Sequence, residues 1–227
     1  MKGIKRVLVA NRGEIAIRVI RACHELGLRA IAVYSNEDKN SLFRTKADEA
    51  YEIGHNKGPI EAYLNINEII ATAKAKGADA IHPGYGFLAE NAEFAKRCEQ
   101  AGIVFIGPSH QTIAAMGDKI KSKQLAKVAG VPTIPGSDSP IPTVNEAYDI
   151  AESCGYPVMV KASAGGGGRG MRIVHCKEDL AREFESAKRE AHKAFGNGDV
   201  FIEKYLSNPK HIEVQILADN KIGRAHV

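Results

Sequence analysis

A run of five glycines within six positions, GGGGRG at 165–170, places the strongest constraint on how this chain of 227 residues folds. Inside a regular element each glycine costs roughly 0.5–1 kcal/mol relative to alanine, so the run does not suit the interior of a helix or strand. Residues 158–162 (VMVKA) before it and 171–176 (MRIVHC) after it have the patterns of strands. We therefore expect a hairpin whose tip is the glycine run.

The hairpin prediction excludes several known glycine-rich nucleotide-binding motifs for this run. Gly165, Gly167 and Gly170 satisfy G-x-G-x-x-G, but a dinucleotide fingerprint opens a helix, whereas a strand follows here. A Walker loop ends in Gly-Lys-Ser/Thr, and a kinase loop has its strand lysine after the glycines, whereas Lys161 precedes them. Backbone N–H groups without Cβ atoms can approach phosphate oxygens, and Lys161 and Arg169 add positive charge. The sequence therefore predicts a phosphate-binding hairpin, with an unliganded surface turn as the alternative.

The first hundred residues alternate between strand and helix patterns. Strands are expected at 4–10, 30–34, 78–82 and 103–107, and helices at about 15–26, 65–76 and 89–100. Short connections between alternating elements favour a parallel sheet that is covered by helices. We predict an α/β domain that ends near residue 107.

The remaining residues follow a different plan. Helical connecting segments are expected at 109–134, a proline-rich loop at 135–142, a helix that starts with a capping box at Thr143 and Glu146, and then the elements 158–162, 171–176, 177–194, 199–205 and 211–218. Of the last five elements, 177–194 is a long helix with an apolar stripe, and the other four are strands. This order predicts an α+β second domain.

Composition excludes several classes of protein. Hydrophobic residues make up 44% and charged residues 26%, which is typical of globular proteins, and no apolar run is long enough to cross a membrane. A net charge of +4 without tryptophan argues against nucleic acid as a partner. The four cysteines lie far apart without a CxxC motif, so we expect no zinc site, a reducing cytoplasm as the compartment, and buried side chains for Cys23 and Cys98.

Three further places carry polar residues whose spacing fits two interpretations. Lys119 begins a helical segment, and alone it fits a solvated lysine. One face of the predicted strand 211–218 carries three polar side chains, His211, Glu213 and Gln215, which form either a solvated row or the floor of a site. HPGYGFLAEN (82–91) follows a strand directly, where loops line the crevice of an open α/β sheet, and the alternative is a helix-entry loop.

Six segments stand out from the rest of the sequence: VLVANRGEIAIRVIRA (7–22), AIHPGYGFLAEN (80–91), FIGPS (105–109), MGDK (116–119), KASAGGGGRGM (161–171) and EKYLSNPKHIEVQ (203–215). Taken together, they resemble the biotin carboxylase component of biotin-dependent carboxylases. They occur in the family's order over essentially the whole chain. The resemblance implies a Rossmann-like domain at 1–107, a helical linker at 108–134, an ATP-grasp lid domain at 135–205, and the first strands of a truncated ATP-grasp domain at 206–227.

The resemblance also implies a reaction. ATP phosphorylates bicarbonate, the carboxyphosphate yields CO2, and a ureido nitrogen of biotin captures it, with Mg²⁺ as the metal. Lys119 and Lys161 would contact the phosphates of ATP, with Gly165, Gly166, Gly167 and Gly168 as a closing lid. The other ATP-binding residues would be Met171, Glu203, Lys204, Tyr205, Leu206 and His211. Tyr85 and Gly86 would lie near the ureido ring of biotin.

Partners follow from the same resemblance: a biotin carboxyl carrier, a carboxyltransferase, and further copies of the parent chain. KGPIEAYL (57–64) favours pyruvate carboxylase as the parent, whereas KASAGGGGRGM looks more like acetyl-CoA or acyl-CoA carboxylases. Two further hypotheses stay open, a different ATP-grasp ligase and a nucleotide-binding module without catalysis. The family's catalytic residues and magnesium ligands are expected beyond Val227, so we predict that the chain alone is inactive.

Overall fold

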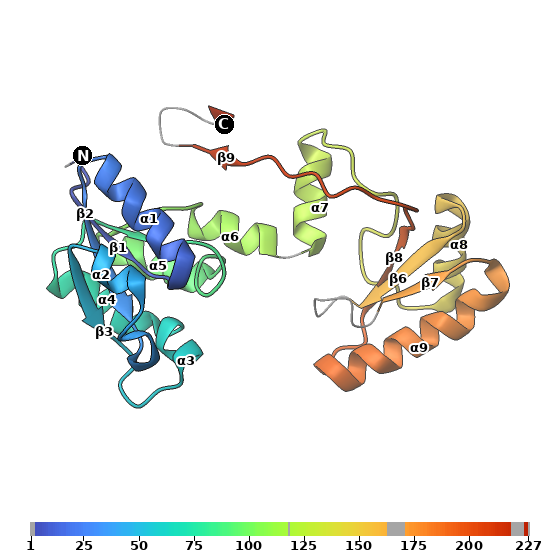
Figure 1. Ribbon diagram of the computed structural model, residues 1–227. Helices are drawn as coiled ribbons and strands as arrows, with labels where there is room; N and C mark the ends of the chain where they lie inside the picture. The colour runs from blue at the N-terminus through green and yellow to red at the C-terminus, as the bar shows by residue number, and fades with distance from the viewer. Residues whose placement is uncertain (1–2, 118, 163–170, 219–224, 227) are drawn as a thin grey trace. The chain divides into compact units, whose positions relative to one another are not determined.

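The computed structural model in Figure 1 describes residues 3–117, 119–162, 171–218 and 225–226, with side chains for all of these except 119–120, 195 and 225–226. The chain forms two compact units, Met1–Ser122 and Lys123–Val227. The helix α7, Lys119–Val128, spans the boundary between them.

The first unit contains a five-stranded parallel sheet with the order β3-β2-β1-β4-β5. Its strands are β1 (Arg6–Val9), β2 (Arg29–Tyr34), β3 (Glu49–Glu52), β4 (Ala80–His82) and β5 (Val104–Phe105). The predicted α/β class is confirmed. The sequence pattern missed β3, because its EAYE residues are all half-buried and lack an apolar run.

Helices cover both faces of this sheet. They are α1 (Gly13–Glu25), α2 (Leu42–Lys46), α3 (Pro59–Tyr63), α4 (Ile66–Ala75) and α5 (Ala92–Gln100), with a 3-10 turn η1 at Asn36–Asp38. A further helix, α6 (His110–Gly117), packs against α5. Leu8 of β1 packs into a core with α3, α4 and α5, whereas Val9 packs into a second core with α1 and α2. Successive strand residues point to opposite faces, so the alternation builds three layers. Cys23 and Cys98 are buried in these two cores, as predicted.

The second unit contains a three-stranded antiparallel sheet with the order β7-β6-β8. Its elements are β6 (Val158–Ala162), β7 (Met171–Val174), β8 (Val200–Lys204), α8 (Val144–Cys154) and α9 (Lys177–Phe195). Val158, Val160 and Ile202 point to one face, where they form a core with α8 and α9. Because β6 and β7 pair on either side of the glycine run, the predicted hairpin is confirmed.

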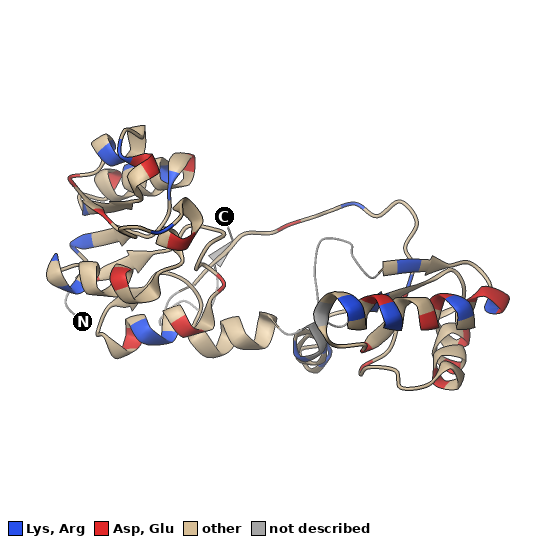
Figure 2. Cartoon of the chain, turned by 90° about the horizontal axis from the view of Figure 1, so that it is seen from below, with Lys and Arg blue, Asp and Glu red and all other residues tan. Residues whose placement is uncertain are grey.

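The long helix α9 has the predicted apolar stripe along one side. Leu180, Phe184 and Ala187 are fully buried against the sheet. Figure 2 shows Lys, Arg, Asp and Glu alternating along the rest of the helix. Among the helices in the described part of the chain, none is long and apolar enough to cross a membrane.

The proline-rich segment 135–141 is not a free loop, because it runs along β8 and is hydrogen-bonded to it. Lys204 N donates to Pro135 O, Ser137 N to Ile202 O and Ile141 N to Val200 O, each at 2.8 Å. A Cβ atom on Gly136 would lie 2.3 Å from the carbonyl oxygen of Ile202, so only glycine permits this approach. The segment therefore covers one edge of the sheet.

Two local predictions need correction. At the start of α8, Thr143 Oγ1 accepts from Glu146 N as predicted, but Glu146 Oε1 accepts from the Thr143 hydroxyl at 3.1 Å and not from the backbone. The strand predicted at 211–218 is limited to β9 (Ile216–Leu217), which pairs with β10 (Ala225–His226). Ile212 is 82% exposed, so the apolar side of the alternating pattern has no core to stabilise it.

Candidate functional site

The strand order of the first unit marks one position as its ligand crevice. The chain leaves β1 for β2 and β3 on one side and then returns to β4 on the other side. Ligands of open α/β sheets bind outside the carboxyl ends of the strands at such a switch point. Asn11 follows β1 there, and the loop 83–86 follows β4. This is the loop that the sequence analysis assigned to biotin.

Two side chains hold the backbone of this loop. The amide nitrogen Nδ2 of Asn11 donates to Pro83 O at 2.7 Å and to Tyr85 O at 2.9 Å. Gly84 N donates to Nδ1 of His82 at 2.9 Å. Three consecutive residues of the loop are therefore tied to the ends of β1 and β4. Asn11 was not among the residues predicted from the sequence, although a polar residue directly after a buried parallel strand was a usable signal.

The two residues predicted to contact biotin lie on the open side of this loop. The side chain of Tyr85 is 66% exposed. Gly86 has a φ of +72°, which favours glycine, and a Cβ atom there would meet nothing within 4 Å. The loop thus combines a fixed backbone with an accessible aromatic side chain and an accessible glycine.

The hydrogen bond to Gly84 requires an unprotonated Nδ1 on His82, and the surroundings favour that form. Burial lowers the pKa of His82 below its ordinary value of 6.5. A proton on Nδ1 would turn the acceptor into a donor that faces the N–H of Gly84. The loop is therefore sensitive to acid through one side chain.

We expect wild-type protein to lose more stability in mild acid than His82→Asn. An asparagine oxygen can accept from the N–H two residues later, as in an Asx turn, and it does not titrate near neutral pH. Below pH 6.5 the unfolded chain binds a proton at His82 while the folded chain stays neutral, so the free energy of unfolding falls as the pH decreases. Urea denaturation at pH 7.5 and 5.5 measures this, and equal losses in both proteins would contradict it.

A buried carboxylate beside the crevice anchors Arg12, the residue directly before α1. Arg12 binds Asp38 through two hydrogen bonds of 2.6 Å, and Asp38 is 3% exposed. Tyr63 and Ser41 also donate to Asp38, at 2.7 and 2.9 Å. Burial raises the pKa of Asp38, but the hydrogen bonds from Arg12, Tyr63 and Ser41 outweigh it and leave the pKa below its ordinary value. This network was not predicted from the sequence.

In the second unit, the face of the sheet opposite the helices carries three of the predicted ATP residues, Lys161, Met171 and Glu203. Strand register places six side chains on this face, Met159, Lys161, Met171, Ile173, Phe201 and Glu203. Met171 and Ile173 are 45% and 40% exposed. An antiparallel sheet with one solvated face normally shows polar residues there, so exposed apolar side chains mark a binding surface.

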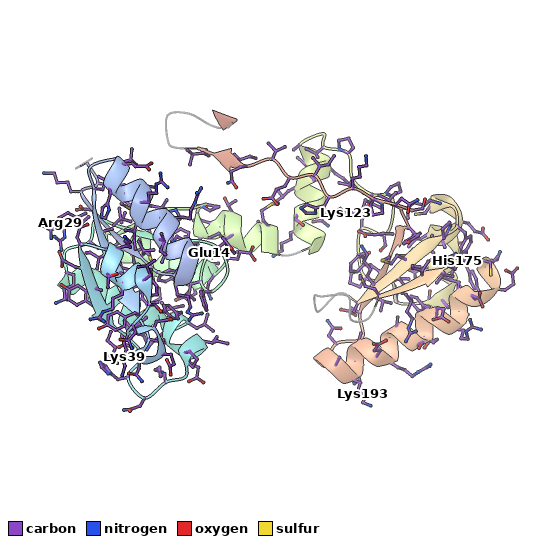
Figure 3. The ribbon with its side chains drawn as sticks, viewed as in Figure 1. Glu14, Arg29, Lys39, Lys123, His175 and Lys193 are labelled. Atoms are coloured by element: carbon purple, nitrogen blue, oxygen red, sulfur yellow. The ribbon has the colours of Figure 1, made fainter. Side chains whose placement is uncertain are left out.

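Charged groups lie within this apolar face. Lys161 Nζ lies 2.5 Å from Glu203 Oε2, and Lys123 Nζ of α7, labelled in Figure 3, lies 3.9 Å from Glu203 Oε1. Lys123 also donates to Ser137 O at 3.2 Å. Two cations around one carboxylate leave a net positive charge. Lys123 had no distinguishing sequence signal, because it is one of several lysines in a helical segment.

The other described residues that were predicted to bind ATP do not lie on this face of the sheet. Nζ of Lys204 donates to the carbonyls of Gly155 and Tyr156 at 2.7 and 3.1 Å, so this side chain has a structural contact of its own. Tyr205 N donates to Pro157 O, and Leu206 is 47% exposed. The side chain of His211 is 88% exposed and lies 3.5 Å from Glu213.

Some predicted residues lie outside what the structure describes. These are the glycines of the lid, Gly165, Gly166, Gly167 and Gly168, and the side chain of Lys119. Within the described ranges, no group of three or more His, Cys, Asp or Glu side chains could hold a metal ion.

Comparison with known families accounts for nearly the whole chain. Biotin carboxylase, N-terminal domain, matches residues 3–113. Carbamoyl-phosphate synthase L chain, ATP binding domain, matches residues 118–226. The first match covers the parallel sheet with the loop 83–86, and the second covers the open sheet face with Lys161 and Glu203.

Individual relatives agree with these matches. The 2-oxoglutarate carboxylase small subunit of Hydrogenobacter thermophilus is 57% identical over 95% of this chain and 45% of its own length. Pyruvate carboxylase of Bacillus subtilis is 54% identical over 100% of this chain and 20% of its own length.

A solved structure of a related domain is similar in fold and in sequence. The biotin carboxylase domain dimer of the Hydrogenobacter thermophilus 2-oxoglutarate carboxylase, in complex with MgADP, ADP and bicarbonate, has a TM-score of 0.83 and 55% identity over 97% of this chain and 48% of its own chain. The chain thus spans less than half the length of each of these three relatives. The chain belongs to the biotin carboxylase family, of which it carries the N-terminal domain and the ATP-binding domain.

Proposed function

We propose that this chain binds ATP and biotin as part of an enzyme that carboxylates biotin with bicarbonate. The observation that carries the proposal is the open sheet face of the second unit, where exposed apolar side chains surround Lys161 and Glu203. Apolar side chains suit an adenine ring, and a lysine suits a phosphate group. The related Hydrogenobacter structure holds MgADP and bicarbonate, which supports this assignment.

In this proposal the γ-phosphoryl group of ATP passes to an oxygen of bicarbonate, which gives ADP and carboxyphosphate. Carboxyphosphate breaks down to CO2 and phosphate, and a ureido nitrogen of biotin captures the CO2 as its N–H proton passes to the released phosphate. Lys161 offsets phosphate charge, and Glu203 holds the ammonium group of Lys161 in place before the nucleotide arrives. Mg²⁺ would accompany the nucleotide and offset further phosphate charge.

We assign the loop 83–86 to biotin. Tyr85 offers an accessible ring and Gly86 an accessible backbone at the switch point of the first sheet. Both suit a flat ureido ring, which needs hydrogen-bonding groups at its edge and an apolar surface beside it.

The final acceptor that we propose is a 2-oxo acid. Relatives named for pyruvate and for 2-oxoglutarate match the chain about equally well, at 54% and 57% identity. This widens the expectation of pyruvate that came from the sequence alone. We also propose a biotin carrier and a carboxyltransferase as partners, and a dimer like that of the related domain. The cytoplasm stays a prediction, since some relatives are named mitochondrial.

We expect Lys161→Met to weaken ATP binding by about tenfold or more, because a hydrogen bond to a charged group is worth about 1.5–3 kcal/mol. Isothermal titration of this chain with ATP measures the affinity. Lys193→Met, which removes the same charge from the exposed side of α9, is the matched control and should bind ATP as the wild type does. Equal affinities of Lys161→Met and the control would show that Lys161 does not contact phosphate.

The reaction itself is tested on the full-length protein that contains this chain. We expect ATP hydrolysis that requires bicarbonate and that free biotin stimulates. A carbamoyl-phosphate-forming enzyme would instead respond to ammonia, and a nucleotide-binding module would bind ATP without hydrolysing it. Hydrolysis that biotin does not stimulate would overturn the proposed function.

A further inference from the structure

We infer that Asn11 is a positioning residue for biotin, which fixes the backbone of the loop 83–86 so that Tyr85 and Gly86 face the ligand in one arrangement. The inference rests on the proposed assignment of this loop to biotin. It concerns a residue that follows a different strand, β1, and that lies outside the loop.

Both the amide nitrogen and the amide oxygen of the Asn11 side chain are hydrogen-bonded. Asn11 is 1% exposed, and its Nδ2 donates to Pro83 O at 2.7 Å and to Tyr85 O at 2.9 Å. Its Oδ1 accepts from Arg12 N at 2.8 Å. Two donors and one acceptor in this geometry require an amide. An aspartate only accepts, and a serine hydroxyl has a single hydrogen to donate.

The loop approaches Asn11 so closely that the contact depends on both partners. Gly84 has a φ of +66°, and a Cβ atom there would lie 2.6 Å from Nδ2 of Asn11 and 2.7 Å from Cγ2 of Ile15. Any other residue at 84 would push the side chain of Asn11 away. The glycine therefore creates the space in which the amide reaches both carbonyl groups.

The consequence for binding is preorganisation. The carbonyl of Tyr85 is held while its side chain stays exposed, so biotin meets a surface whose backbone is already ordered. A ligand that must first order a loop binds more weakly, because the ordering opposes binding. The residues assigned to ATP begin at Lys119 on α7 and lie outside β1, β4 and the loop 83–86, so loss of Asn11 should affect biotin and leave ATP unaffected.

Two variants of the full-length protein test this. Asn11→Asp places a carboxylate oxygen against two carbonyl oxygens, and Asn11→Ser removes the amide without adding charge. We expect the KM for biotin to rise about tenfold or more in both, because two buried hydrogen bonds are lost, while the KM for ATP changes less than about twofold. In this chain alone, the amide hydrogens of residues 84–86 should exchange faster in Asn11→Ser.

Asn91→Asp is the matched control. Asn91 caps α5 by accepting from Phe94 N at 2.8 Å, and an aspartate accepts equally well, so both KM values should stay as in the wild type. If biotin stimulates the wild type and the KM for biotin is unchanged in both Asn11 variants, this inference alone is wrong. If biotin does not stimulate the wild type, the proposed function is wrong. If neither variant folds, Asn11 acts in stability and the inference is also overturned.

Discussion

Gly54→Ala should lower the free energy of unfolding of the first unit by about 2–5 kcal/mol, from left-handed strain of about 1–2 and overpacking of about 1–3. Gly54 has a φ of +71°, and a Cβ atom there would lie 2.3 Å from Cβ and 2.7 Å from Cα of Ala62. Ala62 is fully buried on α3, so its backbone has no room to move. The added methyl group thus displaces a helix from the core.

Gly77→Ala separates the two causes of this loss of stability, backbone strain and overpacking. Gly77 has a φ of +61°, but a Cβ atom there would meet nothing within 4 Å. We expect a loss of about 1 kcal/mol, from backbone strain alone. Urea denaturation followed by the amide signals of β1 and β4 measures both variants in the same unit. Equal losses would show that the contact with Ala62 relaxes without cost.

The second large effect is expected from Asp38→Ala, which should destabilise the first unit by about 3 kcal/mol. Its carboxylate accepts from Arg12, Tyr63 and Ser41. Arg12 has 46% of its side chain exposed and can return to water, but the hydroxyl of the fully buried Tyr63 loses its acceptor. The loss therefore comes mainly from a buried hydroxyl that is left unpaired.

Glu25→Ala is the comparison for this effect. Glu25 pairs with Arg21 one helical turn away at 2.8 Å, and both side chains are more than half exposed, at 64% and 73%. An exposed pair of this kind contributes less than about 0.5 kcal/mol. Denaturation of the two variants under the same conditions should differ clearly. A loss from Asp38→Ala as small as that from Glu25→Ala would mean that water replaces the network.

The sequence was most informative where a local pattern is compatible with few secondary structures. The glycine run predicted a hairpin, and β6 and β7 pair on either side of it. Alternating strand and helix patterns predicted the parallel sheet and the loop at its carboxyl edge. In both cases local backbone preferences and the tertiary fold agree.

The sequence was least informative where partners are distant. Lys161 and Glu203 are each visible as charged strand residues, but their contact follows from the pairing of β6 with β8 across a separation of 42 residues. Asp38 looks like a surface residue in the polar stretch NED, and only packing against Arg12 and Tyr63 makes it buried. Such contacts depend on register and topology, which local patterns do not determine.

The proline-rich segment along β8 also affects how this protein behaves at high concentration. Unpaired strand edges recruit strands from other molecules, and this recruitment starts aggregation. Hydrogen bonds between β8 and the segment 135–141 occupy the β8 edge of the sheet, and the prolines of the segment cannot donate to another strand. Intermolecular strand addition to the three-stranded sheet is therefore directed to β7, the strand that follows the glycine run.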